Sequence, residues 1–442
     1  MKRRYEITAI AALMVCALFT VPALRAQQQQ TLTKVQQYQI TDMLQAAYNE
    51  VKSNYYDPQL QGLDWKARYK KYSAMIDNAH NLGEGFRIVA AFLSGLKDTH
   101  TFFDPPGRAA SFDTGYRFAL VGDAWFITQV RPKSDAEAKM HIGDQVVTVD
   151  GFNANRNDFN DLQYFLNALA PQASTQFDLR SPAGEERQVV VNSAVKPHMR
   201  VLDLRTHGQD YNDLVRQEEN EEHATRSRVI EKGDAAIWKL QQFDVDIREV
   251  EKEISIARKH KTLILDLRGN PGGYTDSLQW IVGSLFDHDV KIADRVGRKE
   301  HKPQIGKHHG DPFDGKLIVL VDGGSASSSE LLARVIQIEH RGTVIGDRTA
   351  GAVMEAKHYS EESGDDVRVF YGISVTDANL IMTDGKSLEK TGVVPDELLL
   401  PTGADLAAGR DPVLVRAAEL AGVKLDPVEA GKMFPFEWVP IL

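Results

Sequence analysis

Cysteine, excess positive charge and long hydrophobic runs are all scarce in this sequence of 442 residues. Its single cysteine is Cys16. The 52 lysines and arginines are outnumbered by 62 aspartates and glutamates, which gives a formal net charge of −10. A chain with that charge has no electrostatic reason to bind a polyphosphate, so we expect no nucleic acid partner. No segment after residue 26 is long and apolar enough to cross a bilayer, so we expect no integral membrane span there.

The first 26 residues have the features of an export signal. A basic cluster at residues 2–4 precedes an apolar stretch over residues 7–21, and a run of glutamines follows Ala26. This order is typical of a secretory signal peptide. We therefore predict that residues 1–26 are a signal peptide and that the product is periplasmic or secreted. The alternative is an uncleaved anchor, but the apolar stretch is short for a span of about 20 residues. Cleavage would remove Cys16 and with it any disulfide, thiolate metal site or cysteine nucleophile.

The remaining chain reads as a multidomain α/β protein. Apolar residues at helical spacing predict an N-terminal helical domain over residues 31–110, and short alternating runs predict a strand-rich module over residues 113–196. Residues 197–234 are largely polar toward their end and read as an exposed connector. Over residues 235–410, short apolar strands alternate with helices, which predicts a largely parallel sheet covered on both faces. We expect residues 411–442 to form a tail that packs on this α/β core.

Two strand-to-helix turns in the α/β core carry unusual residues. The first, Asp266–Gly273, contains three glycines and a proline, so its bare backbone N–H groups could approach an oxyanion or a phosphate. A Walker loop is excluded because no Gly-Lys-Ser/Thr follows. A turn that merely needs positive φ angles is the alternative interpretation.

The second turn, Val321–Leu331, contains four serines before or within the start of a helix. A serine there would lie at the positive end of the helix, where developing negative charge is stabilised. However, Ser327-x-x-Glu330 is also a capping box, in which the serine only caps N–H groups. Spacing alone leaves nucleophile and cap equally open.

A third candidate is His100, in the segment Lys97-Asp98-Thr99-His100-Thr101 at the end of the helical domain. A lone histidine is most often a polar surface residue, so the position alone does not establish a base. Elsewhere, His308 and His309 lie in a polar loop without metal-ligand spacing, and the acidic segment 360–366 lacks EF-hand spacing. We therefore expect no metal and no other cofactor.

Together these motifs resemble the C-terminal processing, or tail-specific, serine proteases. The resemblance rests on Asp266–Gly273, on Ser325–Glu330 with its helix, on Gly346–Gly351, and on Thr391–Asp396. Members of that family carry a PDZ-like module, and Ile142–Gly151 within residues 113–196 is similar to part of one. The resemblance implies a ClpP/crotonase-like α/β catalytic core over residues 235–410.

One departure from the family pattern decides between its branches. The processing proteases use a lysine base shortly after the Gly-x-x-Thr-x-Gly turn, whereas this chain has Ala352 at the expected place. The tricorn-core branch instead uses a histidine and a glutamate, and Thr99-His100 and Glu389 match those positions, with threonine in place of serine. By the resemblance, Ser327 is the nucleophile, His100 the general base, and Glu389, directly or through Thr99, the group that orients it.

The resemblance further implies an oxyanion hole formed by the Ser328 amide with Gly272 or Gly273. We thus expect an exported serine endopeptidase that acts on polypeptides. Two alternatives stay open: a non-catalytic binding protein on the same scaffold, and a Ser/Lys peptidase that uses Lys357. The sequence also leaves open whether the chain forms a homo-oligomer.

Overall fold

The computed structural model describes residues 32–108, 110–197, 227–364 and 368–438, and the predicted signal peptide and most of the predicted connector lie outside these ranges. A six-stranded sheet forms the centre of the C-terminal half, in the order β10-β11-β12-β15-β16-β19. All its neighbouring strands are parallel except β10 and β11. Its strands are β10 (Arg228–Lys232), β11 (Ala235–Lys239), β12 (Thr262–Asp266), β15 (Lys316–Val321), β16 (Gly342–Gly346) and β19 (Glu397–Leu398).

Helices cover both faces of this sheet, as its continuous apolar strands require. Alternate residues of each strand point to opposite faces. Leu263 and Leu265 of β12 belong to the cluster formed with α7–α9, whereas Ile264 belongs to the cluster formed with α11 and α12. The helices are α7 (Ile247–Ala257), α8 (Thr275–Leu285) and α9 (Ser328–Ile338) on one face, and α11 (Pro412–Leu420) and α12 (Pro427–Lys432) on the other; the short α10 (Gly403–Ala407) precedes them.

Three helices form the N-terminal part of the described chain: α2 (Lys34–Asn54), α3 (Trp65–Ile76) and α4 (Leu82–Leu93). Their apolar faces share one core, in which the rings of Trp65 and Phe92 lie 4.2 Å apart. Tyr371, Ile373 and Val375 belong to the same core but come from a strand near the other end of the chain. The helical part therefore packs against a distant strand rather than standing alone.

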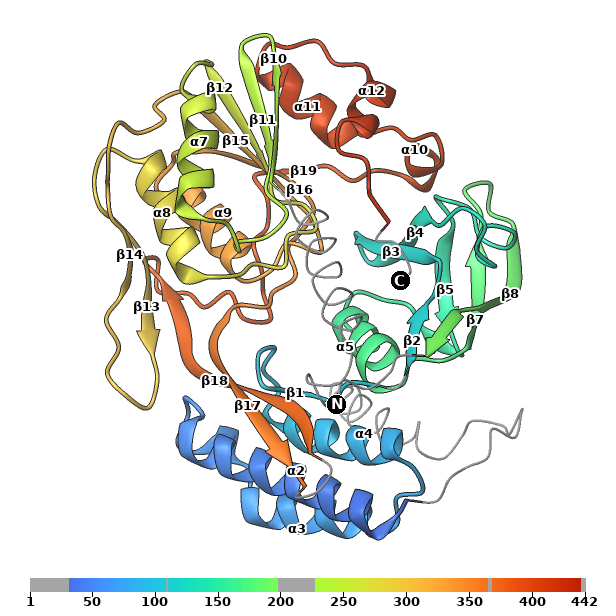
Figure 1. Ribbon diagram of the computed structural model, residues 1–442. Coiled ribbons are helices and arrows are strands. Elements are labelled where there is room, and N and C mark those ends of the chain that lie inside the picture. The colour runs from blue at the N-terminus through green and yellow to red at the C-terminus, as the bar shows by residue number, and fades with distance from the viewer. Residues whose placement is uncertain (1–31, 109, 198–226, 365–367, 439–442) are drawn as a thin grey trace, which may run out of the picture.

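That distant strand belongs to an antiparallel sheet that the sequence did not predict. Its members are β1 (Phe102–Asp104), β13 (Val290–Val296), β14 (Gln304–Gly306), β17 (Met354–Ser363) and β18 (Val369–Met382). Figure 1 shows the long β17–β18 hairpin running from the three helices to the α/β core. Phe103 of β1 pairs with Ile373 of β18, which fixes the end of the helical part against the hairpin.

An antiparallel sheet in the order β3-β4-β5-β7-β8 occupies the side of the molecule (Figure 1). Trp125 and Phe177 lie fully buried in its own core. Arg156 joins it to the α/β core through an ion pair with Asp347, at 2.6 Å. Its elements are β3 (Tyr116–Val121), β4 (Ala124–Val130), β5 (Gln145–Val149), β6 (Phe152–Asn153), α5 (Phe159–Tyr164) with a π-helical turn (Phe165–Leu169), β7 (Ser174–Arg180) and β8 (Glu186–Asn192), flanked by the pair β2 (Ala110–Asp113) and β9 (Ala194–Pro197).

The mixed α/β class and the N-terminal helical part agree with the sequence prediction. The C-terminal segment 411–438 contacts two parts of the molecule. Its helices pack on the six-stranded sheet. Phe436 and Trp438 lie against Arg117 and Arg131 of the strand-rich module over residues 113–196, which we call the side module. The guanidinium carbons lie 4.8 and 4.5 Å from the ring centroids. In the described part of the chain, no helix is long and apolar enough to cross a membrane.

Candidate active site

Ser327 has the most unusual backbone conformation of the serine turn. It directly precedes α9 with φ 54° and ψ −117°, a region that residues with a side chain rarely adopt. Ordinary N-cap residues are extended, as Thr33, Asp64 and Asn81 are in this structure. The Ser327 amide is held by Ala352 O at 2.9 Å and by Glu330 Oε2 at 3.1 Å. Glu330 thus makes the reciprocal bond of a capping box. The strained backbone angle of Ser327 is not needed for capping and indicates a further role.

The three neighbouring serines have structural partners. Ser325 Oγ donates to Leu267 O at 2.8 Å, Ser328 Oγ to Gly273 O at 3.0 Å, and Ser329 Oγ to Asn270 O at 3.0 Å. All three residues are buried, whereas Ser327 is half-buried. Ser327 is therefore the serine of this turn best placed to meet a substrate.

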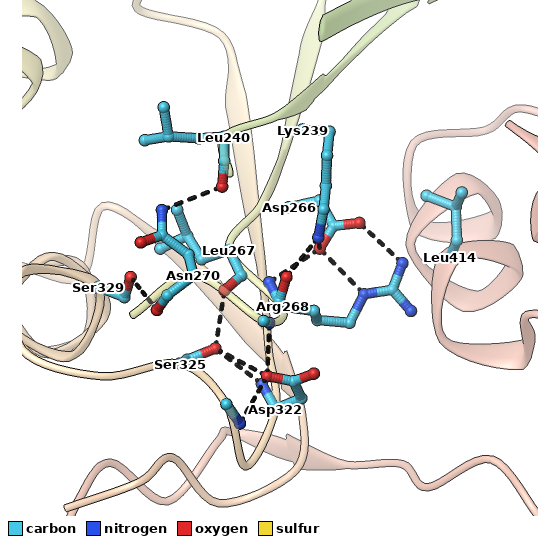
Figure 2. A network of polar contacts seen from close by, with 12 residues as sticks. Lys239, Leu240, Asp266, Leu267, Arg268, Asn270, Asp322, Ser325, Ser329 and Leu414 are labelled. Atoms are coloured by element: carbon cyan, nitrogen blue, oxygen red, sulfur yellow. Dashed lines mark hydrogen bonds and ion pairs between the residues drawn. The ribbon is translucent and has the colours of Figure 1, made fainter. Parts of the chain in front are cut away.

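The bonds from Ser325 and Ser329 join the serine turn to the glycine-rich turn, and Figure 2 shows the two turns side by side. The amide of Gly269 adds a third bond, to Asp322 Oδ1 at 2.8 Å. The turns follow β12 and β15, which are adjacent parallel strands, so their carboxyl ends lie at one edge of the sheet. The fold thus makes a single site from segments about 55 residues apart in sequence.

A buried ion-pair network lies beneath the glycine-rich turn (Figure 2). Asp266 accepts from Arg268 at 2.8 Å and from Lys239 at 3.2 Å, and Arg268 also pairs with Asp411 of the α11 N-cap at 2.8 Å. Burial alone would raise the pKa of Asp266, but the charges of Arg268 and Lys239 hold it well below its ordinary value. The network therefore stays charged and fixes the start of the turn.

Gly272 lies directly against Ser327, and the carbonyl of Gly273 accepts from Ser328 Oγ. A Cβ at Gly272, where φ is +97°, would come within 2.6 Å of Ser327 Cβ, so only glycine fits. The Gly272 amide donates to Asn270 Oδ1 at 2.8 Å. In contrast, neither the Gly273 amide nor the Ser328 amide donates to an acceptor among the described residues. Of the two predicted glycines, Gly273 is therefore the one with an available donor.

His100 belongs to a relay that ends at Glu389. Its Nδ1 lies 2.8 Å from Thr99 Oγ1, and Thr99 Oγ1 donates to Glu389 Oε2 at 2.9 Å. Because that hydroxyl proton goes to the carboxylate, Thr99 can only accept from Nδ1–H. This fixes the tautomer in which Nε2 of His100 is unprotonated and able to take a proton.

The relay and the serine turn flank the same dipeptide. Val353 N donates to Glu389 Oε2 at 3.0 Å, while Ala352 O accepts from the Ser327 amide. Burial lowers the pKa of His100, with Asp98 opposing that effect and Lys390 reinforcing it. Burial likewise raises the pKa of Glu389, against the Val353 hydrogen bond and the charge of Lys390.

Glu330 is a site residue whose role the sequence analysis did not identify beyond the capping box. Its carboxylate accepts from Thr349 Oγ1 at 2.5 Å, Gly351 N at 2.8 Å and Ala352 N at 2.9 Å, besides the Ser327 amide. Burial raises its pKa to about 7, and these hydrogen bonds oppose the rise. Glu330 thus binds the turn after β16 to the serine turn, a role that only the folded loops reveal.

Lys357, the alternative base, lies on β17. Its Nζ forms an ion pair with Asp377 at 3.1 Å, and its side chain is 60% exposed. The hydrogen bond and charge of Asp377 raise the pKa of Lys357, so the amine stays protonated at neutral pH.

Within the described ranges, no group of three or more histidine, cysteine or acidic residues is arranged to hold a metal ion.

Two regions of the chain match known families. Residues 234–399 match peptidase family S41, whose members are serine-type peptidases, and residues 37–93 match the tricorn protease C1 domain. The first region contains both turns, Lys357 and Glu389, and the second contains most of α2–α4.

Curated relatives have names of the same kind. The chain is 25% identical over 402 residues to a "putative tricorn protease homolog 2" of Streptomyces coelicolor, covering 85% of this chain and 32% of the relative. It is 26% identical over 274 residues to a carboxy-terminal-processing protease of Bartonella bacilliformis, covering 59% and 55%. It is 27% identical over 286 residues to the tail-specific protease of Haemophilus influenzae, covering 60% and 38%. The chain thus spans between about a third and a half of these relatives.

Solved structures share the fold. The structure of mature CPAF complexed with lactacystin superposes with a TM-score of 0.63 at 15% identity, over 85% of this chain and 96% of that one. The photosystem II D1 C-terminal processing protease gives a TM-score of 0.54 at 17% identity, over 90% of this chain and all of the other. These similarities extend the likeness beyond the S41 region to most of the chain.

Proposed function

We propose that this chain, whose residues 234–399 match peptidase family S41, is a serine endopeptidase that cleaves polypeptides with Ser327 as nucleophile and His100 as general base. The observation that carries the proposal is the His100–Thr99–Glu389 relay, which flanks the same Ala352-Val353 dipeptide as the strained Ser327.

In the first step, Nε2 of His100 takes the Ser327 proton while Oγ attacks the scissile carbonyl carbon. The amides of Gly273 and Ser328 donate to the oxyanion that forms, since neither has another acceptor in the described chain. The imidazolium then gives its proton to the leaving amine. Water releases the acyl group by the same steps in reverse, and Glu389 stabilises the imidazolium through Thr99.

Two features argue against the Ser/Lys alternative. Lys357 is paired with Asp377 and its pKa is raised, whereas a lysine base needs a depressed pKa.

The non-catalytic alternative requires a site without an activated serine. The amides of Gly273 and Ser328 donate to no acceptor in the described chain, and Ser327 has a strained backbone φ that a cap alone would not need. Both features favour catalysis.

The module over residues 113–196 gives the proposal a substrate-binding surface. Its strand β3 is an edge of the antiparallel sheet, so an extended polypeptide could add to it as a further strand, as PDZ domains bind C-termini. We assign this PDZ-like role to the module because Gly122 and Arg156 anchor it directly to the turn that carries Thr349.

A fluorophosphonate probe tests the proposal. We expect it to label the wild-type chain at Ser327, identified by peptide mass mapping, and Ser327→Ala to abolish both labelling and peptide hydrolysis. Loss of the cap should cost about 0.5–2 kcal/mol of stability. Ser325→Ala is the matched control: it removes a buried hydroxyl with structural partners, so it should lower stability by about 1–3 kcal/mol and keep the labelling. A folded wild-type chain that takes up no probe would favour the binding protein.

A further inference from the structure

Asp98 precedes the Thr99-His100 pair and accepts four hydrogen bonds. Its Oδ1 accepts from His100 N at 3.0 Å, Thr101 N at 2.7 Å and Thr376 Oγ1 at 2.7 Å. Its Oδ2 accepts from the hydroxyl of Tyr55 at 2.9 Å. One carboxylate thus gathers donors from the histidine turn, from β18 and from the residue that ends α2.

The donors differ in what they fix. The two amides shape the turn itself, which begins at Lys97 in the left-handed region with φ 59°. Thr376 is fully buried on β18 and also contacts Thr101, whose hydroxyl lies 3.1 Å from Thr376 Oγ1. Tyr55 is fully buried between the helices and the hairpin. The turn therefore cannot move relative to α2 or β18 without breaking bonds to Asp98.

Resting on the proposed function, we propose that Asp98 is a positioning residue for His100: it folds the turn that carries the imidazole and fixes that turn to α2 and β18. The charge of Asp98 also raises the pKa of His100 against the effect of burial, so it should favour the imidazolium that forms when His100 takes the serine proton. The other charged groups that face His100 are Lys390, which acts in the opposite sense, and Glu389 through Thr99.

Two substitutions separate the geometric role from the electrostatic one. Asp98→Ala removes all four acceptor bonds, and we expect kcat to fall by on the order of 10²-fold with little change in KM, because displacement of a catalytic group by about 1 Å costs that much. In Asp98→Asn, the amide oxygen can still accept from the turn and the amide nitrogen can donate to Tyr55. This variant should keep more of kcat, and the acid limb of its pH–kcat/KM profile should move to lower pH, since the negative charge is gone.

Tyr55→Phe keeps the shape of a buried ring and removes one donor to Asp98. This variant should lower kcat but leave the acid limb of the pH–kcat/KM profile in place, because only a change in charge would move that limb. Asp104→Ala is the matched control, because Asp104 lies exposed on β1, four residues after His100, with no hydrogen-bond donor to its side chain among the described residues.

The readouts distinguish this proposal from the one on which it rests. If the wild-type chain is not labelled at Ser327, the proposed function fails. If the wild type is labelled and Asp98→Ala, Asp98→Asn and Tyr55→Phe match Asp104→Ala in labelling rate, kcat and pH profile, only the role of Asp98 is overturned. Should Asp98→Ala not fold, Asp98→Asn and Tyr55→Phe decide alone.

Discussion

His100 and Lys357 differ in the direction in which the fold moves their pKa values, and this allows the base to be identified. His100→Ala should reduce turnover by about 10²–10⁴-fold, whereas Lys357→Ala, which removes only an exposed ion pair with Asp377, should leave it nearly unchanged. Because burial lowers the pKa of His100, the imidazole stays neutral further into the acid range than a free histidine with pKa of about 6.5. Activity should therefore rise with pH below about 6.5. A rise in the alkaline range, lost in Lys357→Ala, would restore the Ser/Lys mechanism.

Glu389 reaches His100 through the Thr99 hydroxyl, and a pair of variants tests whether this relay supports catalysis. Glu389→Gln and Thr99→Val should each lower kcat by less than the roughly 10⁴-fold loss seen when a carboxylate that contacts the histidine directly is neutralised. Because both act on one path, their effects should not add in the double variant. Steady-state kinetics of the two single variants and the double variant give the answer. Full additivity, or wild-type kinetics in both single variants, would contradict the relay.

The serine residues show what sequence could and could not predict at this scale. The position of Ser327 before a helix predicts either a nucleophile or a cap, and its positive φ, which favours the first, cannot be read from the residue types. The sequence indicates only a capping role for Glu330, since its bonds to Thr349, Gly351 and Ala352 need a turn that follows another strand. The Thr99–Glu389 contact was an alternative that the resemblance left open.

Among the elements, the glycine-rich turn offers a matched comparison between two glycines. Gly272→Ala would place a Cβ against Ser327 and force an L residue to φ +97°, so it should cost about 1–3 kcal/mol from the backbone alone and most of the activity. Gly269 also has a positive φ, +71°, but a Cβ there meets no atom within 4 Å. Gly269→Ala should therefore cost about 1 kcal/mol and keep the activity. Denaturant melts and probe labelling measure both, and equal loss of labelling would argue against contact with Ser327.

Element prediction succeeded where burial is continuous and failed where it is not. The strands β12 and β15 are largely apolar and buried, and they lie in the segment over residues 235–410 where the sequence predicts short apolar strands between helices. The sequence does not predict the hairpin β17–β18, because β17 consists mostly of charged and polar residues, a composition that a surface loop shares. Its pairing with β1 could not be predicted either, since alternation indicates a strand but not its partner.

For the whole molecule, one buried carboxylate makes two of the contacts that attach the module over residues 113–196 to the α/β core. Asp347 accepts from Arg156 at 2.6 Å and from Gly122 N at 2.8 Å. Asp347→Asn should weaken this attachment by about 3 kcal/mol, because it leaves Arg156 largely buried beside a neutral partner. Hydrogen exchange at residues 120–123 should therefore speed up. Arg348→Gln, which breaks only the exposed pair with Asp123, is the control and should cost at most about 1 kcal/mol. Equal exchange in both variants would mean that the module is held elsewhere.

The pairing of β1 with β18 has a consequence during synthesis of the protein on the ribosome. Phe103 can pair with Ile373 only after β18 has been made, and Glu389, the proposed orienting carboxylate, is made later still. At roughly 5–20 residues per second, the ribosome takes about a quarter of a minute to a minute to make that intervening chain. Throughout this interval the proposed base and nucleophile are not assembled. Under the proposed mechanism, a translation product that ends before β18 should therefore not hydrolyse peptides, and activity requires a nearly complete chain.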